Sequence, residues 1–226
     1  MARDIRVGPL FATPLVTTTL DNVDPRKIAT VVCALRDAGF MYSGPMVAGL
    51  QTQGNFLLID HPEVRKLRDA FVDVIAAVTN AQDHVLSTRG WANILRKGDA
   101  SADTPHNHLP NHWSAVYYPQ VPALTGHEGH LLVIDPREVF APGQPVAVPP
   151  QTGMFVMFPS WLRHSVVPMR QADGERISVS LNAIIGPRPD APAACYPPHR
   201  LKKRAPGQSP DQEFDPASPA SFPYPA

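Results

Sequence analysis

Short apolar runs separated by glycine and proline dominate the sequence from Gly90 onward. They read WANIL, HWSAVYY, GHLLVI, PVAVP, GMFVMF, RHSVVPM and RISVSLNAII. Short strands packed this closely along a chain are typical of a β-sandwich or a β-barrel. The pattern therefore predicts a mainly β core over residues 90–186.

Helical patterns dominate the region before this core. The β-branched stretch PLFATPLVTTTL predicts one strand, and Asp24 before Pro25 is a typical start for a helix that ends at Gly39. A second helix is predicted from about His61, because apolar residues recur there at helical spacing. These residues are Val64, Leu67, Phe71, Val74, Ile75 and Val78. We expect residues 24–82 to form helical support for the core.

The segment 187–226 differs from the rest of the chain in composition. It holds many of the 27 prolines and shows almost no apolar periodicity. Such a sequence is typical of an extended chain rather than a packed domain. We therefore expect one domain over residues 1–186, followed by a proline-rich tail.

The balance of charge argues against nucleic acid and anionic membranes as partners. The 226 residues include 20 Lys and Arg and 20 Asp and Glu, so the formal net charge is zero and no global field attracts nucleic acid or an anionic membrane. No apolar run reaches the roughly 20 residues that span a bilayer. The N-terminal residues lack the apolar stretch of a secretory signal, which predicts a cytoplasmic protein. Cys33 and Cys195 lack paired spacing and are interpreted as free thiols.

Three histidines fall within a stretch of seven residues, HNHLPNH, from His106 to His112. Alternate residues of an extended segment point to the same side, so His106 and His108 can present both imidazoles to one point. His112 has the same parity, but Pro110 and Asn111 favour a turn before it. Neutral imidazole suits iron, manganese, nickel, copper or zinc rather than magnesium or calcium. On its own, such a cluster could equally be the polar rim of a loop.

A further histidine opens a later predicted strand. His164 follows the apolar run MFVMF and a proline turn at Pro159. In a barrel of β-strands, a ligand at this place can meet a His-x-His from an earlier strand. His106, His108 and His164 are therefore candidate ligands of one metal ion.

The run RISVSLN, residues 176–182, alternates strictly between polar and apolar residues. Its polar face, which includes Arg176 and Ser178, lies either in water or along a pocket. In a pocket, Arg176 would hold a carboxylate through two parallel hydrogen bonds, and Ser178 would add a third.

Five motifs along the chain resemble those of a family of iron(II)/2-oxoglutarate oxygenases. The family pattern is H-x-H, W-S-G-V-Y-Y, D-P-R, F-P-S-W-L-x-H and R-I-S-x-S-x-N. The corresponding stretches here are HNH (106–108), WSAVYY (113–118), DPR (135–137), FPSWLRH (158–164) and RISVSLN (176–182). The resemblance covers roughly residues 11–185 and leaves the tail outside.

This resemblance implies a jelly-roll core, the double-stranded β-helix, with flanking helices. It implies Fe(II) as the metal, 2-oxoglutarate and O2 as cosubstrates, and succinate, CO2 and an oxidised substrate as products. By position, His106 and His164 match the two histidines of the oxygenase metal site. Arg176 matches the residue that salt-bridges the distal carboxylate of 2-oxoglutarate, and Ser178 and Tyr118 match its neighbours at that carboxylate.

One position departs from the wider superfamily. The common metal site has two histidines and a carboxylate, and the carboxylate normally stands where this chain has His108. Three neutral imidazoles would leave the iron more positive by one charge. Asp103 and Asp135 are the nearest alternatives for a carboxylate ligand, and we prefer the interpretation with three histidines.

Two other functions compete with an oxygenase. A cupin-type metalloprotein, a three-histidine dioxygenase or isomerase that does not use 2-oxoglutarate, fits the spacing of Gly153, Pro159 and His164. A non-catalytic β-barrel binding module would hold no metal and would use its tryptophans for packing.

The substrate is the least determined feature. We expect an enzyme that hydroxylates a small molecule or a substrate bound to a carrier or peptide, although desaturation, cyclisation and halogenation use the same oxidant. The sequence leaves a homodimer open.

Overall fold

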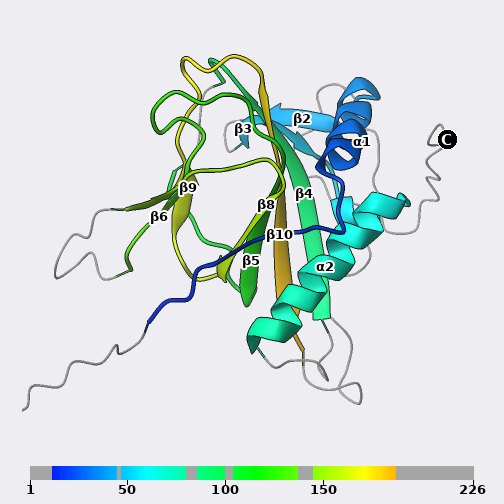
Figure 1. Cartoon of the computed structure of the whole chain (residues 1–226), viewed down its shortest axis with the longest axis vertical. Helices are drawn as coiled ribbons and strands as arrows, with labels where there is room; N and C mark the ends of the chain where they lie inside the picture. The colour runs from blue at the N-terminus through cyan, green and yellow to red at the C-terminus, as the bar shows by residue number, and fades with distance from the viewer. Residues whose placement is uncertain (1–11, 45–46, 80–85, 100–103, 137–144, 187–226) are drawn as a thin grey trace, which may run out of the picture.

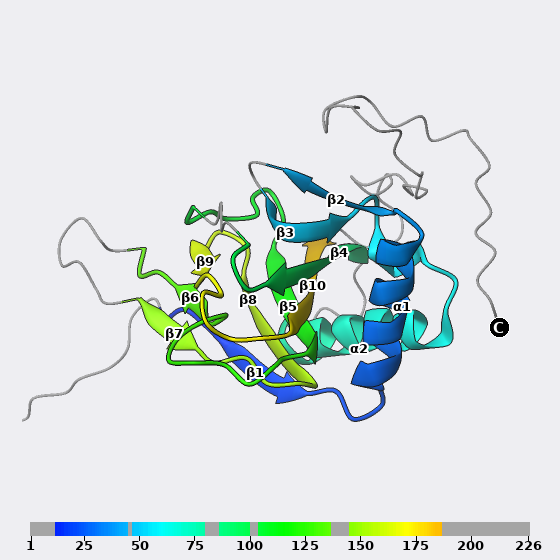
Figure 2. The same cartoon turned by 90° about the horizontal axis from the view of Figure 1, so that it is seen from above.

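Three layers make up the described part of the protein. The computed structural model describes residues 12–44, 47–79, 86–99, 104–136 and 145–186. A small sheet, a large sheet and a pair of helices follow one another across the molecule (Figure 1, Figure 2). The large sheet is thus covered on one face by helices and on the other by the small sheet, so both of its faces are shielded from water.

The large sheet has seven antiparallel strands in the order β1-β8-β5-β10-β4-β3-β2. They are β1 (Val16–Thr19), β2 (Met41–Gly44), β3 (Val47–Thr52), β4 (Leu86–Arg96), β5 (Trp113–Gln120), β8 (Met154–Pro159) and β10 (Glu175–Ile185). β10 occupies the centre and pairs with β4 along its whole length, from Glu175 opposite Arg96 to Ile185 opposite Leu86. This long central pairing fixes the register of every side chain that the two strands present.

The small sheet has the order β7-β6-β9. Its strands are β6 (Leu131–Val133), β7 (Val146–Val148) and β9 (His164–Val166), and both pairings are antiparallel. Apolar residues of the two sheets meet in a core that includes Val116, Val133 and Phe158. Two facing antiparallel sheets form the jelly roll that the resemblance implied.

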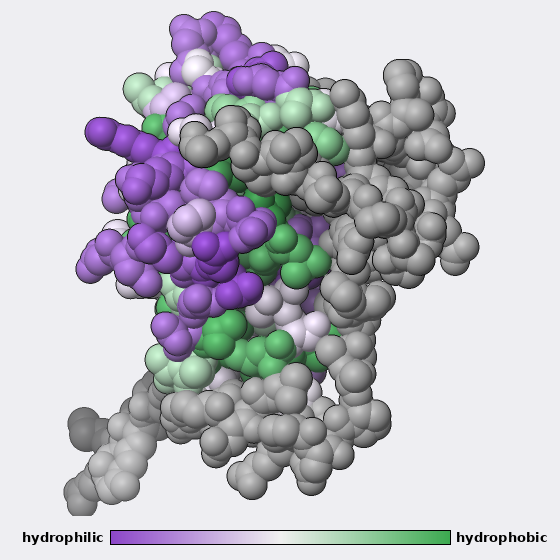
Figure 3. All heavy atoms as spheres, turned by 90° about the vertical axis from the view of Figure 1, so that its right-hand side faces the viewer, coloured by the Kyte–Doolittle hydropathy of each residue, from purple (hydrophilic) through white to green (hydrophobic). Residues whose placement is uncertain are grey.

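Both helices pack an apolar stripe on the large sheet. In α1 (Pro25–Asp37), Asp24 caps the first turn by accepting a hydrogen bond from the Arg26 N–H at 2.9 Å. α2 (Pro62–Thr79) follows a short 3-10 helix, Phe56–Leu58. Seen from the side of the helices, the described surface is largely hydrophilic (Figure 3). In the described residues, neither helix has the length and apolar character of a bilayer span.

The sequence predicted most of these elements. All seven predicted strands after Gly90 are present, as are the strand before Asp24 and the two helices with their predicted starts. The prediction of purely helical support over residues 24–82 was incomplete, since β2 and β3 lie between the helices and extend the large sheet. The proline-rich tail, 187–226, lies outside the described residues and stays a prediction.

The contact between α2 and the sheet generates a prediction about stability. Phe71 is fully buried and its ring lies 6.1 Å from that of Phe155 on β8, centre to centre. Phe71→Ala should lower the free energy of unfolding by about 3–5 kcal/mol, because loss of the ring would leave a cavity between α2 and the sheet. Urea denaturation measures this loss. Val78→Ala, on the same helix but 41% exposed, is the matched control and should change it by under about 1 kcal/mol; equal losses would contradict this packing.

Candidate metal centre

Two backbone hydrogen bonds bring distant histidines together. The His106 N–H donates to the His164 carbonyl at 3.1 Å, and the His164 N–H donates back to the His106 carbonyl at 2.9 Å. The His108 N–H donates to the carbonyl of Ser160, in the turn before β9, at 2.9 Å. Residues 106–108 therefore run beside β9 in the extended form under which His106 and His108 were expected to share one side.

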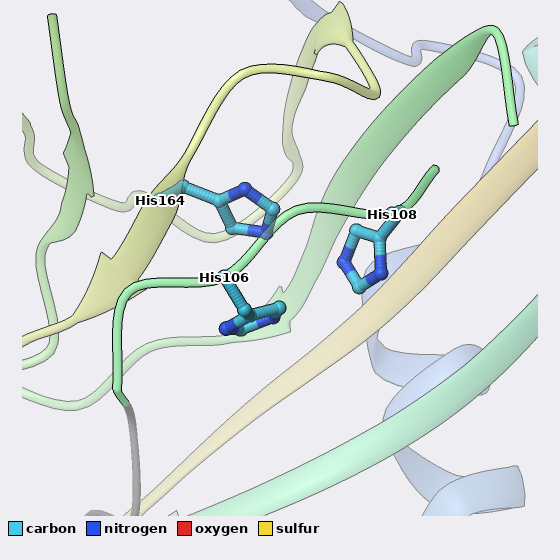
Figure 4. A group of neighbouring side chains, drawn as sticks. All are labelled: His106, His108 and His164. Atoms are coloured by element: carbon cyan, nitrogen blue, oxygen red, sulfur yellow. The ribbon is translucent and has the colours of Figure 1, made fainter. Parts of the chain in front are cut away.

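The three imidazole rings converge on one point. Their ring centres are 4.7 Å apart for His106 and His164, and 5.0 Å apart for both other pairs. One nitrogen from each ring lies within 4.8 Å of the nitrogens of the other two. Figure 4 shows His106 and His108 on one segment and His164 entering from β9, with the rings turned toward one another.

Backbone carbonyls set the proton positions on two of these rings. Nδ1 of His106 lies 3.0 Å from the Thr104 carbonyl, and Nδ1 of His164 lies 3.0 Å from the Leu162 carbonyl. A carbonyl only accepts, so each Nδ1 carries the proton and each Nε2 keeps its lone pair. This is the arrangement in which a histidine binds a metal through Nε2.

Burial keeps the imidazoles of His108 and His164 neutral. Burial, together with the neighbouring His164 and His106, lowers the pKa of His108 to about 3. Burial also lowers the pKa of His164 to about 4, although the hydrogen bond with the Leu162 carbonyl acts in the opposite direction. Both imidazoles therefore stay uncharged at neutral pH, and each can donate the lone pair of its unprotonated nitrogen to a cation.

The donor set suits a transition metal such as iron. In the described part of the chain, the group of side chains that could hold a metal consists of these three histidines, and Asp135 is not a member. Asp103 lies outside the described residues. His112 takes another role, since its Nδ1 accepts a hydrogen bond from the Ile185 N–H at 2.8 Å. Borderline nitrogen donors without a carboxylate fit Fe(II) or its neighbours in the series.

The histidines open onto a cavity of about 460 Å³ that both sheets line. Its floor comes from alternate residues of the two central strands, which are Arg89, Trp91, Asn93 and Leu95 on β4 and Arg176, Ser178, Ser180 and Asn182 on β10. The residues between them, such as Ala92 and Val179, face the core under the helices. The polar face of RISVSLN thus lines a pocket rather than the protein surface.

A buried guanidinium occupies one end of this cavity. Arg176 is 3% exposed, donates from Nη1 to the Ser178 hydroxyl at 3.2 Å, and lies over the Tyr118 ring with its guanidinium carbon 5.0 Å from the ring centre. Burial raises the pKa of Tyr118, and the charge of Arg176 acts in the opposite direction. The buried Tyr118 hydroxyl has no hydrogen-bond partner of standard geometry among the described residues. A carboxylate would fit this end, because it accepts from both groups.

A buried polar network that sequence reasoning missed supports His108. The Ser114 hydroxyl donates to Asn182 Oδ1 and lies at hydrogen-bond distance from the Ser160 hydroxyl, both at 2.8 Å. All three side chains are buried, and the Ser160 carbonyl holds the His108 N–H. Each residue lies in one of the five motifs, but nothing local in the sequence shows that the three meet.

The tryptophans divide between cavity, core and surface. Trp91 lines the cavity and its ring centre lies 5.4 Å from that of His108. Trp113 packs against the helix-side core, while Trp161 is 42% exposed. Only Trp91 therefore shapes the site, although Trp113 and Trp161 stand nearer to histidines in the sequence.

Comparison with known proteins agrees with this geometry. Residues 89–182 match the model of a family described as "Putative 2OG-Fe(II) oxygenase". No curated protein matches the chain.

Solved structures share the fold at low sequence identity. A prolyl-4-hydroxylase from Pseudomonas putida is 17% identical with a TM-score of 0.55, over 74% of this chain and 91% of that one. The 2-oxoglutarate-dependent carbocyclase SnoK from nogalamycin biosynthesis is 15% identical with a TM-score of 0.58, over 78% and 83%. A prolyl hydroxylase from Trichoplax adhaerens is 12% identical with a TM-score of 0.54, over 75% and 83%.

The matched residues contain the histidine cluster, Arg176 and the two strands that form the floor of the cavity. The family description names both iron and 2-oxoglutarate, and the matched residues hold both a candidate metal site and a buried guanidinium. The family match over residues 89–182 and the shared fold of these structures therefore support a 2OG-Fe(II) oxygenase.

Proposed function

We propose that this oxygenase hydroxylates an unactivated C–H bond of its substrate, with Fe(II) held by His106, His108 and His164. Arg176, with Ser178 and Tyr118, would bind the distal carboxylate of 2-oxoglutarate. The observation that carries the proposal is that the histidine cluster and the buried Arg176 line one cavity of about 460 Å³. That volume is in the range of small-molecule sites.

The three histidine rings would bind the metal from the positions that they already occupy. Fe(II) supplies the oxidising chemistry with O2 and 2-oxoglutarate, which leaves as succinate and CO2. The chain's own contribution would be to present three lone pairs, two of which, on His106 and His164, have their nitrogen fixed by a hydrogen bond from the ring to a backbone carbonyl. Because Fe(II) accepts imidazole nitrogen readily, this donor set supports iron binding even without a carboxylate.

Arg176 would recognise the cosubstrate through charge and shape. A carboxylate beside it would accept two parallel hydrogen bonds from the guanidinium. The hydroxyl of Tyr118, buried against the same guanidinium, would donate another. The surrounding Leu95, Leu131 and Val166 are apolar, which excludes water and strengthens these interactions.

Hydroxylation is the outcome we assign among several that the fold accommodates. Structural neighbours include prolyl hydroxylases, but also an α-ketoglutarate-dependent epimerase and a carbocyclase. We propose a small molecule, or a residue of a peptide or carrier, as the substrate. A cupin-type function without 2-oxoglutarate would leave Arg176 without a role in the cavity, so binding of 2-oxoglutarate separates the two.

The metal ligands generate the first prediction from this site. Each of His106→Ala, His108→Ala and His164→Ala should lower Fe(II) affinity at least about 10-fold, because each removes one of three donors. Anaerobic titration calorimetry measures the affinity. His112→Ala is the matched control, as this histidine lies in the same loop and binds the Ile185 N–H instead. Equal loss in the control would contradict the assignment.

His108 can be tested against the carboxylate alternative. His108→Asp would create the commoner set of two histidines and one carboxylate. If His108 is the third ligand, this variant should bind Fe(II) more tightly than His108→Ala. If neither change affects binding, a carboxylate such as that of Asp103 or Asp135 is the ligand instead.

The buried network under His108 generates a prediction about both stability and metal affinity. Ser114→Ala should lower the free energy of unfolding by about 1–3 kcal/mol, because two buried polar partners lose a hydrogen bond. It should also weaken Fe(II) binding roughly 10-fold, since Ser160 positions His108. Urea denaturation and metal titration measure the two effects. Ser43→Ala, at an exposed position of β2, should change neither.

Arg176 generates the prediction that tests the function most directly. Arg176→Gln should weaken 2-oxoglutarate binding by about 2–4 kcal/mol, because the distal carboxylate would lose its charged partner. The readout is the visible charge-transfer band on addition of 2-oxoglutarate to the anaerobic Fe(II) protein. Lys97→Gln, an exposed cation that pairs with Asp173, is the control.

The same wild-type preparation then decides the function. Succinate release in a screen of candidate substrates supports an oxygenase that uses 2-oxoglutarate. A protein that binds Fe(II) but neither binds nor consumes 2-oxoglutarate would overturn the proposal in favour of a cupin-type activity.

A further inference from the structure

A carboxylate joins two loops that lie far apart in the sequence. Glu128 belongs to the loop that connects β5 to β6. Its Oε1 accepts hydrogen bonds from the N–H groups of Arg170, at 2.9 Å, and Gln171, at 2.8 Å, and its Oε2 accepts one from the Ala172 N–H at 2.8 Å. These three residues lie in the loop that connects β9 to β10. One side chain thus satisfies three consecutive N–H groups of a distant loop.

The Glu128 carboxyl group is ionised in this contact. The hydrogen bonds from the N–H groups of Ala172, Arg170 and Gln171 lower the pKa of the Glu128 carboxyl, although desolvation acts in the opposite direction. An ionised carboxylate has two acceptor oxygens and no donor, which suits N–H groups that converge on it. Because hydrogen bonds to a charged acceptor are stronger than neutral ones, Glu128 links the two loops more firmly than a neutral side chain would.

Backbone hydrogen bonds extend this link toward the small sheet. The Gly129 N–H donates to the Val167 carbonyl, and the Val167 N–H donates to the His130 carbonyl, both at 2.9 Å. They continue the antiparallel ladder between β6 and β9 into the two loops. The position of Gly129 is therefore fixed from both sides, by Glu128 before it and by this ladder after it.

The side chain of Arg176 lies against the main chain of Gly129. A Cβ atom placed on Gly129 would lie 3.0 Å from Cδ of Arg176 and 3.4 Å from its Nε, closer than ordinary contact between such atoms. Gly129 has a left-handed backbone, with a φ of +68°, which glycine adopts without a steric cost. The lack of a side chain thus lets the loop touch the stem of the guanidinium that lines the cavity.

An apolar cluster closes the same end of the cavity. It is formed by Leu124 of the first loop, Met169 and Ala172 of the second, and Leu95 and Val166 of the strands. Leu95 lies opposite Arg176 in the pairing of β4 with β10, and both Leu95 and Val166 line the cavity. Exclusion of water strengthens the attraction between a guanidinium and a carboxylate, so separation of the two loops would weaken it.

We propose that Glu128 is a positioning residue of the cosubstrate site. By joining the two loops it keeps Gly129 against Arg176, which holds the guanidinium in place for the distal carboxylate of 2-oxoglutarate. This inference rests on the proposed function, because it takes Arg176 as the partner of that carboxylate. Glu128 acts through Gly129 rather than by contact with 2-oxoglutarate. Its effect comes from conformational freedom, since an arginine that is already ordered loses less of it on binding.

Titration with 2-oxoglutarate tests the link. The full chain is loaded anaerobically with Fe(II), and the charge-transfer band reports binding of the cosubstrate. Glu128→Ala should bind 2-oxoglutarate about 10-fold more weakly, because binding then has to order a long side chain. Its affinity for Fe(II), measured by calorimetry, should stay within about 2-fold of the wild type. The histidine segment is held by hydrogen bonds to Ser160 and to β9, in which Glu128 takes no part.

A second keto acid distinguishes positioning from a general loss of structure. 2-Oxopentanoate has a methyl group where 2-oxoglutarate has its distal carboxylate, so it forms no ion pair with Arg176. Glu128→Ala should therefore leave its affinity within about 2-fold of the wild type. In an Arg176→Gln background, Glu128→Ala should likewise weaken 2-oxoglutarate by no more than about 2-fold, because residues that act as one unit are not additive. Equal losses with both keto acids, or in both backgrounds, would overturn the proposal.

Two further variants complete the comparison. Glu128→Gln keeps the size of the side chain and one acceptor oxygen, so it should weaken 2-oxoglutarate by about 3-fold, and it decides the question if Glu128→Ala does not fold. Asp173→Ala is the matched control, since this carboxylate lies in the second loop but pairs with the exposed Lys97. It should leave the affinity for 2-oxoglutarate unchanged, and a loss as large as that in Glu128→Gln would contradict a specific role of Glu128.

The outcomes also separate this inference from the proposed function. If the wild type does not bind 2-oxoglutarate, or if Arg176→Gln binds it as tightly as the wild type, the proposed cosubstrate site fails and this inference fails with it. If Arg176→Gln weakens binding but both Glu128 variants bind 2-oxoglutarate like the wild type, only the role of Glu128 is overturned.

Discussion

The reciprocal pair of backbone hydrogen bonds between His106 and His164 is the contact on which the site depends. It joins an irregular segment to the edge of the small sheet and sets two imidazoles 4.7 Å apart, centre to centre. His108 follows from it, because an extended segment returns to the same side after two residues. The geometry of the candidate metal centre is therefore a property of the backbone, and the contacts of the His106 and His164 rings with backbone carbonyls only refine it by fixing the ring protons.

The two central strands divide structure from chemistry. On β4 and β10, one face packs Ala92, Ile94 and Val179 beneath the helices, while the other face presents the polar side chains of the cavity. Successive side chains of a strand point to opposite faces, so burying one face under the helices directs every second residue into the cavity. The helices thus determine indirectly where the arginines point, since a slip of one residue would exchange the two faces. Packing of the helices on one face of β4 and β10 thus stabilises the strand register that orients the cavity residues on the other face.

Electrostatics distinguish the two parts of the cavity. Desolvation lowers the pKa of His108 and His164 and so keeps both imidazoles neutral, whereas guanidinium keeps its charge in any surroundings. The cavity therefore sets uncharged nitrogen donors beside the buried cation of Arg176. This arrangement suits a metal ion and an anionic diacid in one cavity, without any net charge on the whole protein.

Local pattern determined much of this protein. Periodicity and capping fixed the strands after Gly90 and the helix start at Asp24, and parity placed His106 beside His108 and Arg176 beside Ser178, because these features depend on neighbouring residues. The tertiary structure alone decided that His164 joins the cluster while His112 bonds the end of β10. It also decided the meeting of Ser114, Ser160 and Asn182, and the burial of Arg176 in the same cavity as the histidines. Those relations depend on the register between strands distant in sequence, and long-range register leaves no trace in the local alternation of polar and apolar residues.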